Sequence, residues 1–84
     1  GMDELVRYIA KSLVEKPEAV AVTMLEREGE SDIKLRQDPS DMGKVIGKQG
    51  RIAKAIRTVV KAASAKGEKT YLVDILEEDE QEGE

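Results

Sequence analysis

The sequence predicts an α+β fold in which a three-stranded sheet carries three helices on one face. Three observations point to this class. Apolar residues recur at helical spacing in two long segments, a capping signature starts a third helix, and three shorter segments are rich in β-branched or alternating residues. With 84 residues the chain forms one small domain. Because the strands alternate, we expect one sheet face to be covered and the other to face solvent or a partner.

The first half of the chain is typical of a helix followed by a hairpin. Apolar spacing predicts an amphipathic helix over residues 3–16, which Pro17 ends. Residues 19–27 are rich in β-branched and apolar side chains, and residues 32–37 alternate between apolar and polar ones, so both predict strands. Gly29 between them marks a hairpin turn.

The second half predicts two helices and a last strand. Residues 38–41 (DPSD) are typical of a helix start, because Asp38 can cap free N–H groups, Pro suits the first turn and Asp41 is placed close to a capping-box arrangement. A short helix should follow, and a long amphipathic helix should run over about residues 51–66. Residues 69–76 predict the final strand.

Charge is distributed unevenly along the chain. The formal net charge is −4, yet residues 44–69 contain eight basic and one acidic side chain, whereas residues 70–84 contain seven acidic and no basic ones. The basic block consists of Lys44, Lys48, Arg51, Lys54, Arg57, Lys61, Lys66 and Lys69. Such a block is typical of a polyanion-binding surface, and a solvated helix face is the alternative. We expect residues 77–84 to form an acidic, disordered tail.

Several chemistries are disfavoured by composition. The chain has no Cys and no His, which excludes disulfides, thiolate zinc sites, Cys nucleophiles and His-based triads. A P-loop also fails, because only three residues separate Gly43 from Gly47, and Gln49 stands where Ser or Thr must bind magnesium. We therefore expect no enzyme, no cofactor and no metal. The lack of Cys, of a long apolar run and of a signal-peptide pattern predicts an intracellular protein.

The GKQG segment, Gly47–Gly50, is typical of a clamp for a sugar–phosphate backbone. Glycines lack Cβ atoms, so a phosphodiester chain can approach the main chain closely. The start of the next helix offers unpaired N–H groups and a partial positive charge, to which Lys48 and Arg51 add full charges. Ile46 and Ile52 can line an apolar floor for bases. The alternative is a tight turn in a module that binds only protein.

The stretch from Asp41 to Lys61 (DMGKVIGKQGRIAKAIRTVVK) resembles the signature of KH domains, and in particular the small bacterial KH proteins of the KhpA/YlqC-like family. The resemblance covers about residues 2–76. It implies a type II KH domain with the order α-β-β-α-α-β and a mixed sheet. It also implies a bacterial, cytoplasmic protein that binds single-stranded RNA through its GxxG loop, as an RNA chaperone or post-transcriptional regulator, without a membrane or a small-molecule substrate.

The resemblance also assigns residues and partners. The implied RNA-binding residues are Lys44, Ile46, Gly47, Lys48, Gln49, Gly50, Arg51 and Lys54. Family members form homodimers or pair with a larger Jag-type KH protein, so a protein-interaction module with secondary RNA contact is the alternative function. The basic residues from Lys54 to Lys61 are read either as a solvated face or as long-range attraction for phosphate. The acidic tail either screens the basic block when RNA is absent or keeps the protein soluble.

Overall fold

A computed structural model describes residues 1–46, 50–67 and 69–76, with residues 44–46 described by their backbone alone. The elements are α1 (Met2–Leu13), a 3₁₀ turn η1 (Pro17–Ala19), β1 (Ala21–Arg27), β2 (Glu30–Arg36), α2 (Pro39–Ile46), α3 (Arg51–Lys66) and β3 (Thr70–Leu76). The predicted order α-β-β-α-α-β is confirmed, with one additional short turn before the first strand.

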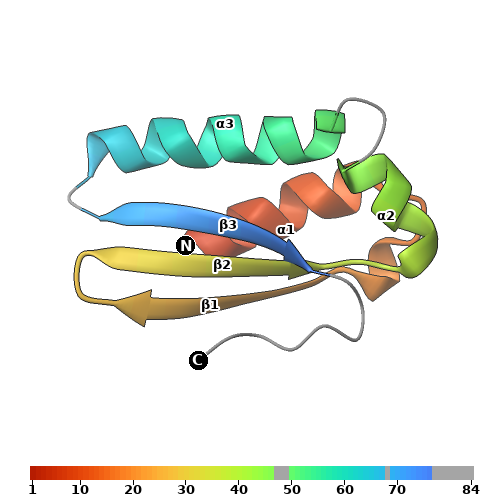
Figure 1. Ribbon diagram of the computed structural model, residues 1–84, viewed down its shortest axis with the longest axis horizontal. Coiled ribbons are helices and arrows are strands. Elements are labelled where there is room, and N and C mark those ends of the chain that lie inside the picture. The colour runs from red at the N-terminus through yellow and green to blue at the C-terminus, as the bar shows by residue number, and fades with distance from the viewer. Residues whose placement is uncertain (47–49, 68, 77–84) are drawn as a thin grey trace.

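The strands form one mixed sheet in the order β1-β2-β3. β1 and β2 are antiparallel, with Ala21 opposite Arg36 and Arg27 opposite Glu30. β2 and β3 are parallel, with Glu30 opposite Thr70. A parallel pair needs a crossover connection, which α2 and α3 supply. The central strand is therefore β2, and β3 forms an edge beside the helices (Figure 1).

The helices are arranged so that α1 and α3 lie over the same face of the sheet, while α2 lies toward one end of it (Figure 1). α1 packs on β1 and α3, α3 packs on β3, and α2 packs on α3. The mixed three-stranded sheet with three helices that the sequence predicts is confirmed. Among the described residues, no helix is both long and apolar enough to cross a membrane.

The core lies between the sheet and the two long helices. Alternation along β2 places Ser31, Ile33 and Leu35 fully inside, as the period-two pattern predicts. The core cluster comprises Val6, Ala10, Val20, Val22, Ile33, Leu35, Ile52, Ile56 and Val60. Burying such side chains is the main favourable contribution to folding a domain of this size.

Three element boundaries differ from the sequence-based expectation by two residues or more, one of them being the start of β2 at Glu30 rather than at residue 32. The first helix ends at Leu13 rather than Lys16, and Val14 already has an extended backbone. Pro17 then starts the 3₁₀ turn, so the first strand begins at Ala21 rather than Ala19. Proline suits the first position of such a turn because its φ is preset and its missing N–H is not needed there. The turn reorients the chain between α1 and β1.

Candidate nucleic-acid interface

The predicted site residues are described to different extents. Gly47, Lys48 and Gln49 lie outside the described residues, so only the residues before and after them in the proposed clamp are described. Lys44 and Ile46 belong to α2 by their backbone. Gly50, Arg51 and Lys54 are described fully, at the start of α3.

Gly50 is the N-cap of α3 and adopts the left-handed conformation, with φ 61° and ψ 39°. A Cβ at this position would meet no other atom within 4 Å, so the conformation, and not lack of space, favours glycine here. No described side chain caps the helix, so its first N–H groups have no side-chain acceptor. This end of α3 can therefore accept an anion, as the glycine pattern predicts.

The outward face of α3 carries four exposed basic side chains at spacings of three and four residues. They are Arg51, Lys54, Arg57 and Lys61, hereafter the α3 basic face. The opposite face, with Ile52, Ile56 and Val60, is buried. Ile52 is thus part of the core, and the expectation that it lines an apolar floor for bases is wrong, because the first turn of α3 directs it inward.

The cations of the α3 basic face are not paired with an acidic side chain among the described residues. None of its four cations forms an ion pair or hydrogen bond with the described part of the chain, and α3 itself contains no acidic residue. Unpaired cations in a row produce a positive potential that attracts a polyanion. This surface can therefore attract a polyanion to the candidate site.

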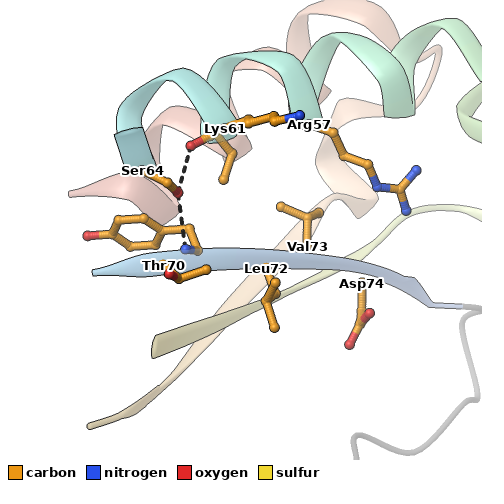
Figure 2. A pocket seen from close by; sticks show the side chains of 9 residues that line it. Arg57, Lys61, Ser64, Thr70, Leu72, Val73 and Asp74 are labelled. Carbon is orange, nitrogen blue, oxygen red and sulfur yellow. Dashed lines mark hydrogen bonds between the residues drawn. The ribbon is translucent and has the colours of Figure 1, made fainter. Parts of the chain in front are cut away.

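A groove of about 430 Å³ runs between α3 and β3, beside the basic face (Figure 2). It is lined by Arg57, Val60, Lys61 and Ser64 from α3 and by Thr70, Tyr71, Leu72, Val73 and Asp74 from β3. Side chains from both faces of β3 line it, so the groove follows the edge of β3 that β2 does not cover. Such an edge offers backbone donors and acceptors next to an apolar wall.

One end of the groove is held closed by Ser64. Its hydroxyl donates to the carbonyl oxygen of Val60 at 3.0 Å and accepts the N–H of Tyr71 at 3.1 Å, as the dashed lines in Figure 2 show. This pair of hydrogen bonds ties the first residues of β3 to the last turns of α3. These bonds therefore help to hold β3 against α3 at this end of the groove.

The start of α2 is held by the buried carboxylate of Asp41. Its two oxygens accept the backbone N–H groups of Glu15 and Lys16, each at 3.0 Å, and the side chain is fully buried. The sequence suggests a capping-box role for Asp41, but the carboxylate instead joins α2 to the segment after α1. The contact therefore fixes the start of α2, the helix that precedes the GKQG segment in the sequence.

Asp38 performs the local capping. Its carboxylate accepts the hydroxyl and the backbone N–H of Ser40. The hydrogen bond from the Ser40 hydroxyl has the larger effect and that from the Ser40 N–H the smaller one. Both favour the charged carboxylate, so the pKa of Asp38 lies below its ordinary value of 3.8. Among the described residues, no group of three or more acidic side chains is placed to hold a metal ion.

Comparison with known proteins identifies the family. The family model described as "KhpA/KhpB, KH domain" matches residues 3–75. The chain belongs to the KhpA/KhpB family of KH domains. The match spans every described helix and strand except the first residue of α1 and the last of β3. The resemblance to small bacterial KH proteins and the KH fold that it implies are both confirmed.

Individual relatives agree with the family model. Each of three is named RNA-binding protein KhpA, and each is covered over its whole length. The protein of Clostridium perfringens is 60% identical over 75 residues, which are 89% of this chain. That of Caldanaerobacter subterraneus subsp. tengcongensis is 55% identical over 75 residues. That of Listeria monocytogenes is 49% identical over 76 residues, 90% of this chain.

Sequence reasoning missed the groove of this KhpA/KhpB family member. Arg57 and Lys61 were recognisable from their spacing on α3, but the residues of β3 that face them gave no local signal. Tyr71 and Val73 are ordinary inward-facing strand residues by pattern. Only the strand order, which leaves β3 at the edge of the sheet, brings them to the groove.

Proposed function

We propose that this chain binds short segments of single-stranded RNA with low sequence specificity. The carrying observation is the α3 basic face, whose four exposed cations lie in no described ion pair and two of which, Arg57 and Lys61, border the α3–β3 groove. The relatives' names support the choice of RNA over other polyanions. We further propose that the protein acts in the bacterial cytoplasm as an RNA chaperone or post-transcriptional regulator.

In this proposal the phosphodiester backbone lies on the GxxG segment and the start of α3. Gly50 lets the chain enter α3 in a left-handed conformation without a side chain in the way, which supports close approach of the strand. Arg51 and Lys54 then neutralise phosphates. Lys44, which precedes the GxxG segment in the sequence, and Lys48, which belongs to it, add further positive charge. Ile46, Gly47 and Gln49 complete the set that we assign to the clamp.

The bases would occupy the α3–β3 groove. Val60 and Val73 offer apolar contact, and the uncovered edge of β3 offers hydrogen-bonding groups to base edges. A strand must be unpaired for its bases to enter such a groove, which favours single-stranded RNA. With only two tyrosines in the chain, aromatic stacking contributes little, so phosphate contacts dominate and sequence preference is weak.

The test is the double variant Lys48→Asp/Gln49→Asp. We expect RNA affinity, measured by fluorescence anisotropy with a labelled single-stranded oligonucleotide, to fall by about tenfold or more, because two negative charges enter the phosphate site. The matched control is Lys11→Asp/Ser12→Asp, which changes net charge equally on the exposed end of α1. Circular dichroism checks that both variants fold. Unchanged affinity in a folded Lys48→Asp/Gln49→Asp protein would remove the clamp from the proposal.

A protein-interaction module is the second candidate. The sheet face opposite the helices exposes Leu25 and Leu72, at 42% and 45%, and no described element covers it. A homodimer, or a heterodimer with a larger Jag-type KH protein, would bury these side chains. Sedimentation with and without RNA separates the candidates, since a monomer that binds RNA by itself argues against a module whose main role is assembly.

A further inference from the structure

The acidic C-terminal segment lies outside the part of the chain that defines the family. Residues 77–84 contain six acidic and no basic side chains. The family model ends at residue 75, and two relatives are matched over their whole length by 75 residues of this chain. The KH fold therefore does not require this segment, and its charge calls for a separate explanation.

The α3 basic face is the surface whose charge complements this segment. Basic side chains on and beside the sheet have described acidic partners: Lys34 contacts Asp74 at 2.6 Å, and Lys69 contacts Glu26 at 3.2 Å. The four cations of the α3 basic face have none in the described part of the chain. An acidic segment gains most where positive charge is not already neutralised, so α3 is favoured over the outer face of the sheet.

The segment also starts at a suitable place. β3 runs antiparallel to α3: Tyr71, near the start of β3, is bonded to Ser64 near the end of α3. Further along, Asp74 shares the groove with Arg57, so Leu76 lies toward the N-terminal end of α3 (Figure 1). Eight extended residues reach up to about 26 Å. The basic face from Arg51 to Lys61 spans only about 15 Å, so the segment is long enough to follow it.

We propose that residues 77–84 lie along the α3 basic face in the free protein and compete with RNA for it. The competition rests on the proposed function, whereas the docking itself does not. The contact consists of exposed ion pairs, which are individually weak, but the covalent link keeps the segment at a high effective concentration. An RNA strand that places several phosphates on the α3 basic face displaces the acidic segment. Anions that make only weak contacts with this face do not displace it.

The location of the segment can be measured without RNA. Because the chain has no cysteine, Gly83→Cys provides a single attachment site for a nitroxide spin label. At low salt we expect the label to broaden the amide signals of Lys54 and Arg57 in the NMR spectrum, but not those of Thr23 and Leu25 on the outer sheet face. Salt of about 0.5 M should remove the effect, since charge screening is strong there.

Two results would overturn the docking. One is broadening at Thr23 and Leu25 instead of α3, and the other is no selective broadening at low salt. Contacts between molecules are detected by mixing isotope-labelled chains without nitroxide with spin-labelled chains of natural isotope content. Broadening in that mixture would mean that the segment reaches a second copy, which also contradicts the proposal.

Competition is tested by neutralising half of the segment in the full chain. Glu80→Gln/Glu82→Gln/Glu84→Gln should bind single-stranded RNA about three- to tenfold more tightly at low salt, with the gain lost at high salt. The matched control, Glu4→Gln/Glu18→Gln/Glu28→Gln, changes net charge equally at exposed positions outside the segment. Equal gains in both triple variants would reject competition. Failure of every variant and the unmodified chain to bind RNA would instead reject the proposed function, leaving the spin-label result to stand.

Discussion

The two outer surfaces of this KH domain carry similar numbers of basic residues but handle them differently. On the sheet, strand pairing brings opposite charges together: Lys34 lies opposite Asp74 in the parallel register, and Arg27 lies 3.7 Å from Asp32. On α3, neighbours at three and four positions along the basic face are also basic. The difference teaches that the placement of counter-charges, and not the number of cations or the acidic pI of about 4.9, marks a polyanion-binding surface.

The largest expected effect concerns Asp41, whose buried carboxylate accepts two backbone N–H groups. Asp41→Ala removes the acceptor of two backbone N–H groups in a buried position, so we expect the free energy of unfolding to fall by about 2–4 kcal/mol. Chemical denaturation measures the loss. Asp41→Asn is the control of similar size, and because its amide retains one acceptor oxygen, its loss should be smaller. A loss below about 1 kcal/mol for Asp41→Ala would contradict the positioning role.

The next prediction addresses the α3 basic face directly. Arg57→Glu/Lys61→Glu should lower RNA affinity by about tenfold or more while leaving the fold intact, because both side chains are exposed and both border the groove. Arg7→Glu/Lys11→Glu on α1 has the same charge change at the same helical spacing. If both double variants lose affinity equally, the overall charge, and not the position of the cations, controls binding.

Ser64→Ala should have a smaller effect, limited to one end of the groove. Loss of the hydroxyl frees the N–H of Tyr71, so we expect about 1 kcal/mol lower stability and a several-fold weaker RNA affinity. Hydrogen exchange at the Tyr71 amide should accelerate. Ser12→Ala is the matched control, because Ser12 donates to the carbonyl of Tyr8 in the same way but has no second partner in the described structure. An unchanged rate of hydrogen exchange at the Tyr71 amide in Ser64→Ala would show that the Ser64 hydroxyl does not hold the start of β3 to α3.

The sequence predicted the elements well because their signals are local. Periodicity along β2 indicated that Ile33 and Leu35 are buried, and both are. The resemblance of residues 41–61 to known KH domains implied the KH fold before any contact was known. The left-handed conformation of Gly50 at the start of α3 was not predicted, because the sequence argument considered only the missing Cβ.

The contacts that shape the site could not be predicted in this way. Asp41 binds backbone groups 25 and 26 residues away, and Lys34 meets a partner 40 residues away. Asp41 was interpreted as part of a local cap, because a carboxylate near a helix start usually serves that role. The groove required the strand order, since the same β3 sequence in the centre of the sheet would have no free edge.

The smallest expected effect comes from removing the acidic partner of a cation that now forms an ion pair. Glu26→Gln releases Lys69, which lies just before β3 at the Ser64 end of the groove. Stability should change by no more than about 0.5 kcal/mol, because the ion pair is exposed. RNA affinity at low salt should rise about twofold, as one more cation becomes available to phosphate. Glu18→Gln has the same charge change without releasing a cation in the described structure, so it should raise affinity less. The two variants differ only in which acidic side chain is neutralised. Equal gains in RNA affinity would therefore mean that local ion pairing does not decide where the RNA strand binds. In that case the contrast between the sheet and α3 would have no functional meaning.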